Sequence, residues 1–426
     1  MNNSVLICGK TGSSKSNTVL ANIEDEQVVV LDIQKRSTAW RGFCLKGGVY
    51  EDLDSQRGLP LKIDFQNSLD REDLLEALLD RRGSTIDLHP QLETVTDYFF
   101  QLCQGDMRTC QRIFRRGDEF LEALERADRD VREWWASQPG GVAWERITAP
   151  TERLTRILTK PAIASRISND DSFLDVLRSG QSYFVDGGDV ITEAEVRFIL
   201  KLRLKTIIRY MKQGGSPLTV VLEESEAAGL ITPQVVNALL TMRKRNLRFV
   251  IVCQEASWGD ERLTEAVLQN TQHVWHAQGG EITARTAAAD LLPMLNPRAI
   301  KEIQERFVAI GDQQFIETRN IYFSLEEQQK RMMQWLLNLQ RGQAFSRSGS
   351  QVRFLQIPEI HVSERQPTVL PRLNWDEPER NSSDNSSTST QPRSRKQGRS
   401  VSDRMKELFG GSREKQSEKR DGDHDA

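Results

Sequence analysis

The chain has 426 residues, with 58 Lys and Arg against 61 Asp and Glu, and a formal net charge of −3. This near balance excludes a protein that coats nucleic acid by bulk positive charge, and any nucleic-acid contact must come from local patches. The sequence has no long apolar run, so we expect neither a signal peptide nor a transmembrane helix. Five cysteines without a C-x-x-C pair favour a reducing compartment and no structural zinc. We therefore expect a cytoplasmic protein.

Short apolar runs bounded by turn residues predict the strands of a mainly parallel sheet. Two runs near the start, 4–8 and 27–31, are apolar without alternation, which is typical of strands buried on both faces. Further strands are predicted at 181–185, 218–222, 248–253 and 273–276. Helical stretches separate them, so the pattern predicts an α/β motor domain built from residues 1–65 and 177–323.

Between these two parts, residues 66–176 show helical periodicity at 71–81, 92–103 and 118–135 and almost no strand signal. We expect an inserted all-helical domain there. The helix predicted at 193–213 carries an apolar stripe and an opposite basic line, which indicates a solvated face or a contact with an acidic partner or nucleic acid. The basic line is Arg197, Lys201, Lys205, Arg209 and Lys212.

The end of the chain changes character. Residues 324–372 are expected to form a C-terminal helix and an extended segment, and 373–426 a disordered tail that is rich in serine and charge. Within the tail, Val401, Met405, Leu408 and Phe409 have the spacing of a short amphipathic segment. The segment Val401–Phe409 either docks on a partner or has this spacing by chance.

The strongest motif follows the first strand directly. A glycine-rich loop between a strand and a helix is the context of a P-loop, whose backbone N–H groups face phosphates. Lys15 would reach the β- and γ-phosphates, and the Ser16 hydroxyl would bind Mg²⁺. Ser14 stands where a glycine is usual, and its Cβ is expected to crowd the loop. The alternative is an ordinary serine-rich turn. The loop residues are Gly9, Lys10, Thr11, Gly12, Ser13, Ser14, Lys15 and Ser16.

Two adjacent carboxylates, Glu223 and Glu224, follow the strand at 218–222. This pattern indicates a Walker B segment, in which Glu223 would hold Mg²⁺ through its waters and Glu224 would polarise the attacking water. Acidic pairs at strand ends are common, so the preceding P-loop gives this interpretation most of its weight.

Gln254 follows the strand at 248–253, where a polar side chain could sense the γ-phosphate; an ordinary loop glutamine is the alternative. A basic cluster at 242–248 precedes this strand. Its arginines could reach a neighbouring subunit's nucleotide, contact a phosphate backbone, or face solvent. His273 and His276 lie three apart on a predicted strand, so they point to opposite faces and cannot share a metal.

In this order, the segments VLICGKTGSSKS, VVVLDIQK, VVLEESEAAGL and LLTMRKRNLRFVIVCQE resemble the conjugative coupling-protein family of type IV secretion. That family belongs to the RecA-like, ring-forming, DNA-pumping ATPases. The resemblance implies a RecA-like P-loop NTPase with ATP and Mg²⁺ as cofactors. It also implies a homo-oligomeric ring, a DNA or nucleoprotein substrate, and a membrane-bound secretion-channel partner that would hold the protein at the inner face of a membrane.

Several positions depart from the family pattern. The usual N-terminal membrane anchor does not precede the first strand. Asp32-Ile33-Gln34-Lys35 replaces Asp-Pro-Lys-Gly, Glu223 replaces Asp, and Ser14 replaces Gly. Three functions therefore stay open: an ATP-driven motor with Glu224, Lys15 and Gln254 as catalytic residues, a degenerate nucleotide switch or structural subunit with little hydrolysis, and a secretion or assembly ATPase that does not act on DNA.

Overall fold

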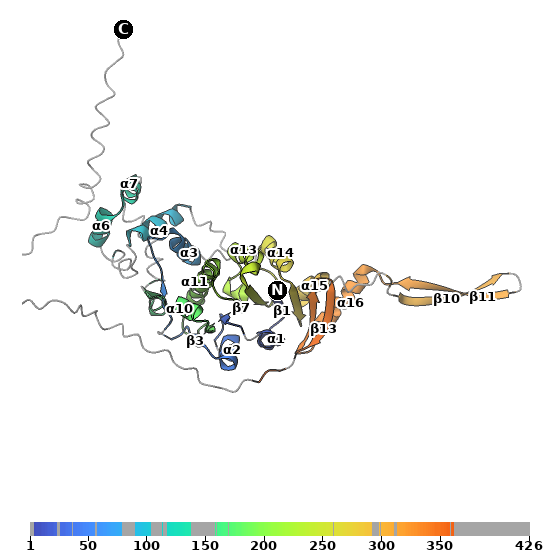
Figure 1. The fold of residues 1–426 in the computed structure, drawn as a ribbon. Helices are drawn as coiled ribbons and strands as arrows, with labels where there is room; N and C mark the ends of the chain where they lie inside the picture. Colours follow the sequence, from blue (N-terminus) through green and yellow to red (C-terminus); the bar gives the residue numbers. More distant parts are fainter. Residues whose placement is uncertain are drawn as a thin grey trace, which may run out of the picture. The chain divides into compact units, whose positions relative to one another are not determined.

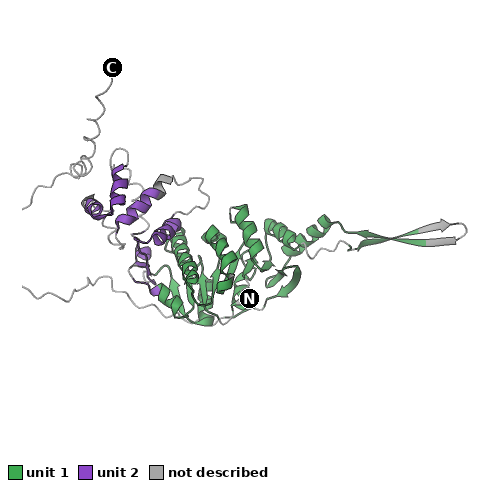
Figure 2. Ribbon diagram, turned by 45° about the horizontal axis from the view of Figure 1, so that its top comes forward, with its two compact units in different colours: residues 1–55, 173–369 green, residues 56–172, 370–426 purple. Residues whose placement is uncertain are grey.

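The computed structural model describes residues 4–361, except for 24–25, 36, 56–57, 79–89, 104–112, 114–116, 138–157, 159, 169, 259, 292–297, 299, 311–312 and 358. The chain divides into two compact units (Figure 2). Unit 1 comprises residues 1–55 and 173–369, and unit 2 comprises 56–172 and 370–426. The sequence places these boundaries after residues 65 and 176, whereas the units divide after residues 55 and 172. The predicted tail, 373–426, lies outside the described residues.

Unit 1 is built on a sheet that has nine strands among the described residues, in the order β13-β12-β9-β1-β8-β7-β2-β6-β3. The strands from β9 to β3 are all parallel, and β12 joins β9 antiparallel. The mainly parallel sheet predicted from the sequence is confirmed. The parallel strands are β1 (Val5–Cys8), β2 (Val28–Leu31), β3 (Val49–Asp52), β6 (Tyr183–Asp186), β7 (Leu218–Leu222), β8 (Leu247–Cys253) and β9 (His273–Ala277).

The apolar composition of these strands explains why they occupy the middle of the unit. Every residue of β1, β2, β6 and β7 is buried, as a sheet covered by helices on both faces requires. Figure 1 shows α1 and α2 on one face of this sheet and α11, α13 and α14 on the other. The helices of this part are α1 (Lys15–Asn22), α2 (Thr38–Lys46), α10 (Ser172–Arg178), α11 (Glu193–Lys212), α12 (Ser225–Ala228), α13 (Pro233–Thr241) and α14 (Glu261–Asn270), with a 3₁₀ turn η1 (Met242–Arg245).

The C-terminal part of unit 1 extends the same sheet. Helix α15 packs against α16 through an apolar cluster that includes Ala287, Leu336 and Phe345. Between these helices a two-stranded hairpin, β10–β11, projects away from the sheet (Figure 1). Residues 324–372, expected to be a helix and an extended segment, also contribute two strands to the sheet. The elements are α15 (Glu281–Asp290), β10 (Ile300–Ile310), β11 (Gln313–Tyr322), α16 (Leu325–Leu337), β12 (Gln343–Ser348) and β13 (Gln351–Gln356).

Unit 2 is helical in its described residues except for one short strand pair. Strand β4 (Leu61–Lys62) pairs with β5 (Ile167–Ser168) in parallel. Strand β5 lies within the insert expected at 66–176 and β4 lies before it; strands of two residues are too short to produce a periodic signal. The helices are α3 (Ser68–Leu78), α4 (Pro90–Leu102), α6 (Gly117–Arg126), α7 (Arg129–Ser137) and α9 (Pro161–Ala164).

The basic line of α11 is buried in its middle and not a solvated face there, whereas Lys212 at its end is exposed. Lys201 is 8% exposed and Lys205 is 4% exposed. Lys205 Nζ donates a hydrogen bond to Oε1 of Gln234, and Arg197 Nε donates to the Ala227 carbonyl, both at 2.9 Å. The long apolar stems of these side chains bury along neighbouring elements while their charged ends find polar partners. The periodic pattern did not distinguish this arrangement from an open surface.

Candidate functional site

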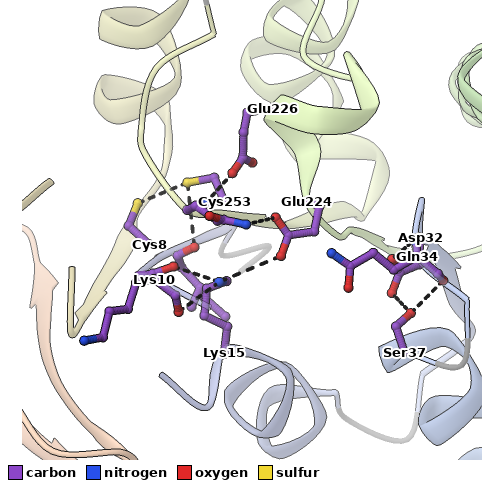
Figure 3. Close-up of polar contacts among 12 residues, drawn as sticks. Cys8, Lys10, Lys15, Asp32, Gln34, Ser37, Glu224, Glu226 and Cys253 are labelled. Carbon is purple, nitrogen blue, oxygen red and sulfur yellow. Dashed lines mark hydrogen bonds and ion pairs between the residues drawn. The ribbon is translucent and has the colours of Figure 1, made fainter. Parts of the chain in front are cut away.

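The sheet brings the predicted site residues together at one edge. Strand β8 lies between β1 and β7, and β7 is followed by β2. Because all four run parallel, their carboxyl ends meet at the same edge, where ligands of open α/β sheets bind. The loop after β1, the carboxylates after β7 and Gln254 after β8 are therefore neighbours: Gln254 donates to Glu224. Figure 3 shows Lys15 of the loop and Glu224 facing each other.

The loop from Gly9 to Ser14 joins β1 to α1 and depends on its glycines. A Cβ on Gly9 would lie 2.7 Å from Ser13 Oγ and 2.9 Å from the Cβ of Ala277, so no larger residue fits. Gly12 has a φ of +82°, in the left-handed region that glycine adopts without steric cost. The Lys10 N–H donates to the Gln278 carbonyl at 2.7 Å, which ties the loop to the end of β9. Thr11 and Gly12 are exposed at the turn.

Ser14 is the residue before α1 and has a left-handed backbone, with φ 71° and ψ 25°. This conformation explains why glycine is usual at the position, since a side chain there costs roughly 1–2 kcal/mol. The loop keeps its shape in spite of this strain. Non-glycine residues in such conformations occur preferentially at functional sites, where the surrounding structure maintains them.

Lys15 is folded back onto the loop. Its ammonium donates to the carbonyls of Gly9 at 2.7 Å and Lys10 at 3.3 Å, and its side chain is 6% exposed. The same Nζ lies 3.9 Å from Oε1 of Glu224. A buried ammonium that is held mainly by carbonyl oxygens can exchange them for the oxygens of an anion bound in the loop.

Glu224 and Gln254 form the second part of the site. Gln254 Nε2 donates to Oε2 of Glu224 at 3.1 Å, and the Gln254 backbone N–H donates to the carboxylate of Glu226. Glu224 also has a left-handed backbone, with φ 45°, immediately before α12. The carboxylate thus lies between the amide of Gln254 and the ammonium of Lys15.

Glu223 and Asp32 make a buried acidic pair next to this group. Burial, together with the nearby Asp32, raises the pKa of Glu223 to about 8. Burial also raises the pKa of Asp32 to about 6, although hydrogen bonds from the Ser37 hydroxyl and the Gln34 N–H favour its charged form. At neutral pH, the Glu223 carboxyl therefore holds a proton unless a cation is bound beside it.

The residues assigned to Mg²⁺ by the sequence, Ser16 and Glu223, are compatible with that ion. Ser16 lies in the first turn of α1 and is half-buried, and one oxygen of Glu223 has no hydrogen-bond partner among the described residues. The described residues include no group of three or more His, Cys, Asp or Glu that could hold a metal. Mg²⁺ bound together with phosphates needs only one or two protein oxygens, because waters and phosphates complete its shell. A divalent cation would also favour the ionised form of Glu223.

Two cysteines lie directly beneath the loop. Cys8 and Cys253 are register partners on β1 and β8, and their sulfur atoms are 3.3 Å apart (Figure 3). Both are free and buried, and burial raises the pKa of the Cys253 thiol well above its usual value. The pair therefore packs the strand ends as free, buried cysteines.

Other residues singled out in the sequence lie in different settings. Arg245 donates to the carbonyls of Met211 and Lys212 at the end of α11, so it caps that helix. The side chain of Arg243 lies outside the described residues. His276 is buried against Asp290 at 2.9 Å, whereas His273 is half-buried on the other face of β9.

Sequence reasoning did not include Arg341. This residue lies in the turn between α16 and β12, and its Nε donates to Ser14 Oγ at 3.2 Å. The two residues are 327 positions apart, and no motif surrounds Arg341 that could have linked it to the loop.

The overall fold occurs in known structures. The bacterial conjugative coupling protein TrwB, in the form TrwBdeltaN70, superposes with a TM-score of 0.60 at 13% identity, covering 85% of this chain and 86% of that one. The fold is that of the conjugative coupling proteins. TrwB in complex with the ATP analogue ADPNP gives a TM-score of 0.59 at 14% identity, over 85% of this chain and 87% of TrwB. VirB4 of Thermoanaerobacter pseudethanolicus gives 0.50 at 13% identity, over 84% of this chain and 89% of VirB4.

The coupling-protein fold predicted from the motifs is thus confirmed, at an identity too low to transfer more than the fold. No protein-family model matches the chain, and no curated protein matches it. Among the described residues, no helix combines the length and apolar character that crossing a membrane requires.

Proposed function

We propose that the protein binds ATP with Mg²⁺ and hydrolyses it as a motor of a conjugative or type IV secretion apparatus. The observation that carries this proposal is the meeting of Lys15, Glu224 and Gln254 beside a P-loop, on the sheet of a coupling-protein fold. Solved structures of TrwB contain ADP with Mg²⁺ and a non-hydrolysable ATP analogue, which supports the same ligands here.

The chemistry follows from the contacts. Backbone N–H groups of Thr11, Gly12 and Ser14 and of the start of α1 would hold the phosphates, since those of Gly9, Lys10 and Ser13 donate to carbonyl oxygens. Lys15 would exchange the Gly9 carbonyl for phosphate oxygens. Glu224 would polarise the attacking water while the Gln254 amide fixes the direction of its carboxylate. Bound Mg²⁺, held by Ser16 and through waters by Glu223, would supply charge neutralisation at the phosphates.

A nucleotide switch with little hydrolysis is the second candidate. Two features favour it: Ser14 maintains a strained backbone in the loop, and burial raises the pKa of Glu223 to about 8, which disfavours the charged form that Mg²⁺ needs. A secretion or assembly ATPase that does not act on DNA is the third.

The partners of the motor belong to the same proposal. They are further copies of the chain in a ring, a DNA or nucleoprotein substrate, a membrane-bound channel component, and whatever binds the segment Val401–Phe409. Such a motor would work in the cytoplasm, at the inner face of a membrane.

Steady-state ATP hydrolysis, measured without DNA and with single- or double-stranded DNA, tests the proposal and separates the three candidates. A DNA-acting motor is stimulated by DNA, an assembly ATPase hydrolyses ATP without stimulation, and a switch binds ATP without turnover. The control variant is Lys15→Ala. It should lose about tenfold or more in ATP affinity, because charge-assisted hydrogen bonds contribute about 1.5–3 kcal/mol. Equal ATP binding by the wild type and this variant would refute the P-loop assignment.

A further inference from the structure

The turn at residues 340–343 is held next to the P-loop by a continuous chain of contacts. Gln278 accepts from the Lys10 N–H of the loop at 2.7 Å, and its side-chain Nε2 donates to the Leu337 carbonyl at the end of α16 at 3.1 Å. The turn itself is closed by a hydrogen bond from the Gln343 N–H to the Gln340 carbonyl at 3.0 Å. The position of Arg341 is therefore set by the fold of unit 1 and not by its own side chain alone.

Arg341 places a cation at the outer side of the loop. Its Nε donates to Ser14 Oγ at 3.2 Å, and its Nη2 donates to Oε1 of Glu359, also at 3.2 Å. The Arg341 side chain is 69% exposed and that of Glu359 is 57% exposed, so both are free to rearrange. Such an exposed ion pair contributes little to stability, typically about 0–1 kcal/mol, which makes the contact easy to exchange.

Guanidinium groups bind phosphate better than they bind a single exposed carboxylate. They present five N–H donors in a fixed plane, which matches two phosphate oxygens at once. Arg341 uses two of its nitrogen atoms in the contacts above, one to Ser14 of the loop and one to Glu359 in the segment after β13. A polyphosphate in the loop would bring several negative charges close to this side chain.

The serine at position 14 fits the same interpretation. Glycine would adopt the left-handed backbone of this residue at no steric cost, yet the chain has a side chain there. The hydroxyl of that side chain accepts the hydrogen bond that holds Arg341 over the loop.

We propose that Arg341 is a phosphate ligand of the bound nucleotide, supplied by the same chain, which exchanges Glu359 for phosphate oxygens when ADP or ATP enters the loop. This inference rests on the proposed nucleotide binding and adds a second cation to Lys15. Ser14 holds the guanidinium beside the loop, and Glu359 competes with the nucleotide for it.

The test measures the dissociation constants of ADP and ATP, with Mg²⁺, for the full-length protein and five variants, one of which is Lys15→Ala. Arg341→Ala should weaken the binding of both nucleotides about tenfold, and Arg341→Lys by less, because the charge remains and the planar fork is lost. Glu359→Gln should tighten binding about two- to threefold, because it removes the competitor. Arg353→Ala is the matched control: this exposed arginine lies on β13 and donates to Gln351 within the same strand, so its removal should leave the affinities unchanged.

The outcomes distinguish this inference from the proposed function. If the wild type binds nucleotide, Lys15→Ala does not, and Arg341→Ala binds within twofold of the wild type, only the role of Arg341 is overturned. A wild-type protein that binds neither nucleotide overturns both. If Arg341→Ala and Arg353→Ala weaken nucleotide binding equally, the cause is a general effect of surface charge. This result also overturns the role of Arg341. Glu359→Gln keeps the test decisive if Arg341→Ala folds poorly, because a gain in affinity cannot arise from lost structure.

Discussion

Gln254 Nε2 donates a hydrogen bond to Oε2 of Glu224 across 3.1 Å, linking the ends of two neighbouring parallel strands, β8 and β7. Lys15 lies 3.9 Å from the other oxygen of the same carboxylate. Each oxygen of Glu224 thus faces a different partner from a different strand end. In the proposed hydrolysis, this geometry is consistent with Glu224 as the reacting carboxylate and Gln254 as the residue that positions it.

The first prediction concerns the division of roles between the two carboxylates. Glu224→Gln keeps the size of the side chain but cannot accept a proton from water, so turnover should fall about 10²-fold or more while ATP still binds. Single-turnover hydrolysis and equilibrium binding of ATP measure the two effects separately. The opposite pattern, with Glu223→Gln abolishing turnover and Glu224→Gln leaving it intact, would reverse the assignment.

The second prediction concerns Gln254 as a positioning residue. Gln254→Ala removes the hydrogen bond that orients Glu224, so kcat should fall about tenfold while KM for ATP changes little. Gln254→Asn should not restore activity, because its amide is one methylene shorter. A change confined to KM would show that Gln254 acts in binding and not in orienting the carboxylate.

The part of this site that local sequence patterns determine could be predicted from the sequence. Glu223, Glu224 and Gln254 follow continuous apolar strands, and parallel strands bring their carboxyl ends to one edge, so local patterns are enough to predict that these residues meet. The strand at 218–222 has the bounds that the sequence predicts.

Arg341 could not be found in this way. Its contact with Ser14 depends on β12 joining β9 antiparallel and on the turn before β12, and neither leaves a periodic signal near Arg341. The burial of Lys201 and Lys205 was missed for a related reason. A basic line on a helix has the same spacing whether it faces solvent or polar partners such as Gln234.

The third prediction concerns strain in the loop. Ser14→Gly should stabilise the protein by about 0.5–1 kcal/mol. Glycine adopts the left-handed backbone without strain, and this gain is partly offset because glycine loses more conformational entropy on folding. Gly12→Ser, at a φ of +82°, should destabilise it by about 1–2 kcal/mol. Denaturant unfolding of the protein without nucleotide measures both changes. Equal stability of all three proteins would mean that the loop relaxes and holds no strain.

The fourth prediction concerns Asp54, which anchors the segment before α11. Its carboxylate accepts hydrogen bonds from the N–H groups of Asp189 and Val190 at 2.8 Å and of Ile191 at 3.2 Å, and it pairs with the Lys35 ammonium. Burial raises the pKa of Asp54, but the Lys35 and backbone hydrogen bonds outweigh it and lower the pKa to about 2. Asp54→Asn should therefore reduce the free energy of unfolding by about 1–3 kcal/mol at neutral pH.

The pH dependence of this effect has a definite sign. The folded pKa of Asp54 lies below its usual value of 3.8, so the stabilisation is fully present above about pH 4 and is lost as the pH falls through about 2. The difference in unfolding free energy between wild type and Asp54→Asn should shrink across this window. A difference that stays constant from neutral pH down to pH 2 would show that the charge of Asp54 contributes nothing.

The fifth prediction concerns assembly of the proposed ring. RecA-like motors complete the nucleotide site with an arginine from the neighbouring subunit, and such a group can raise turnover about 10³-fold or more. Arg245 is engaged with the carbonyls at the end of α11, so Arg245→Ala should mainly lower stability, by about 1 kcal/mol. If another subunit completes the site, the ATPase activity per subunit of the wild type should rise with protein concentration over the range in which sedimentation shows association. If the activity per subunit stays constant while the protein passes from monomer to oligomer, the site is not completed by a neighbouring subunit. Lys15 and Arg341 would then be the cations that contact the phosphates, both from a single chain.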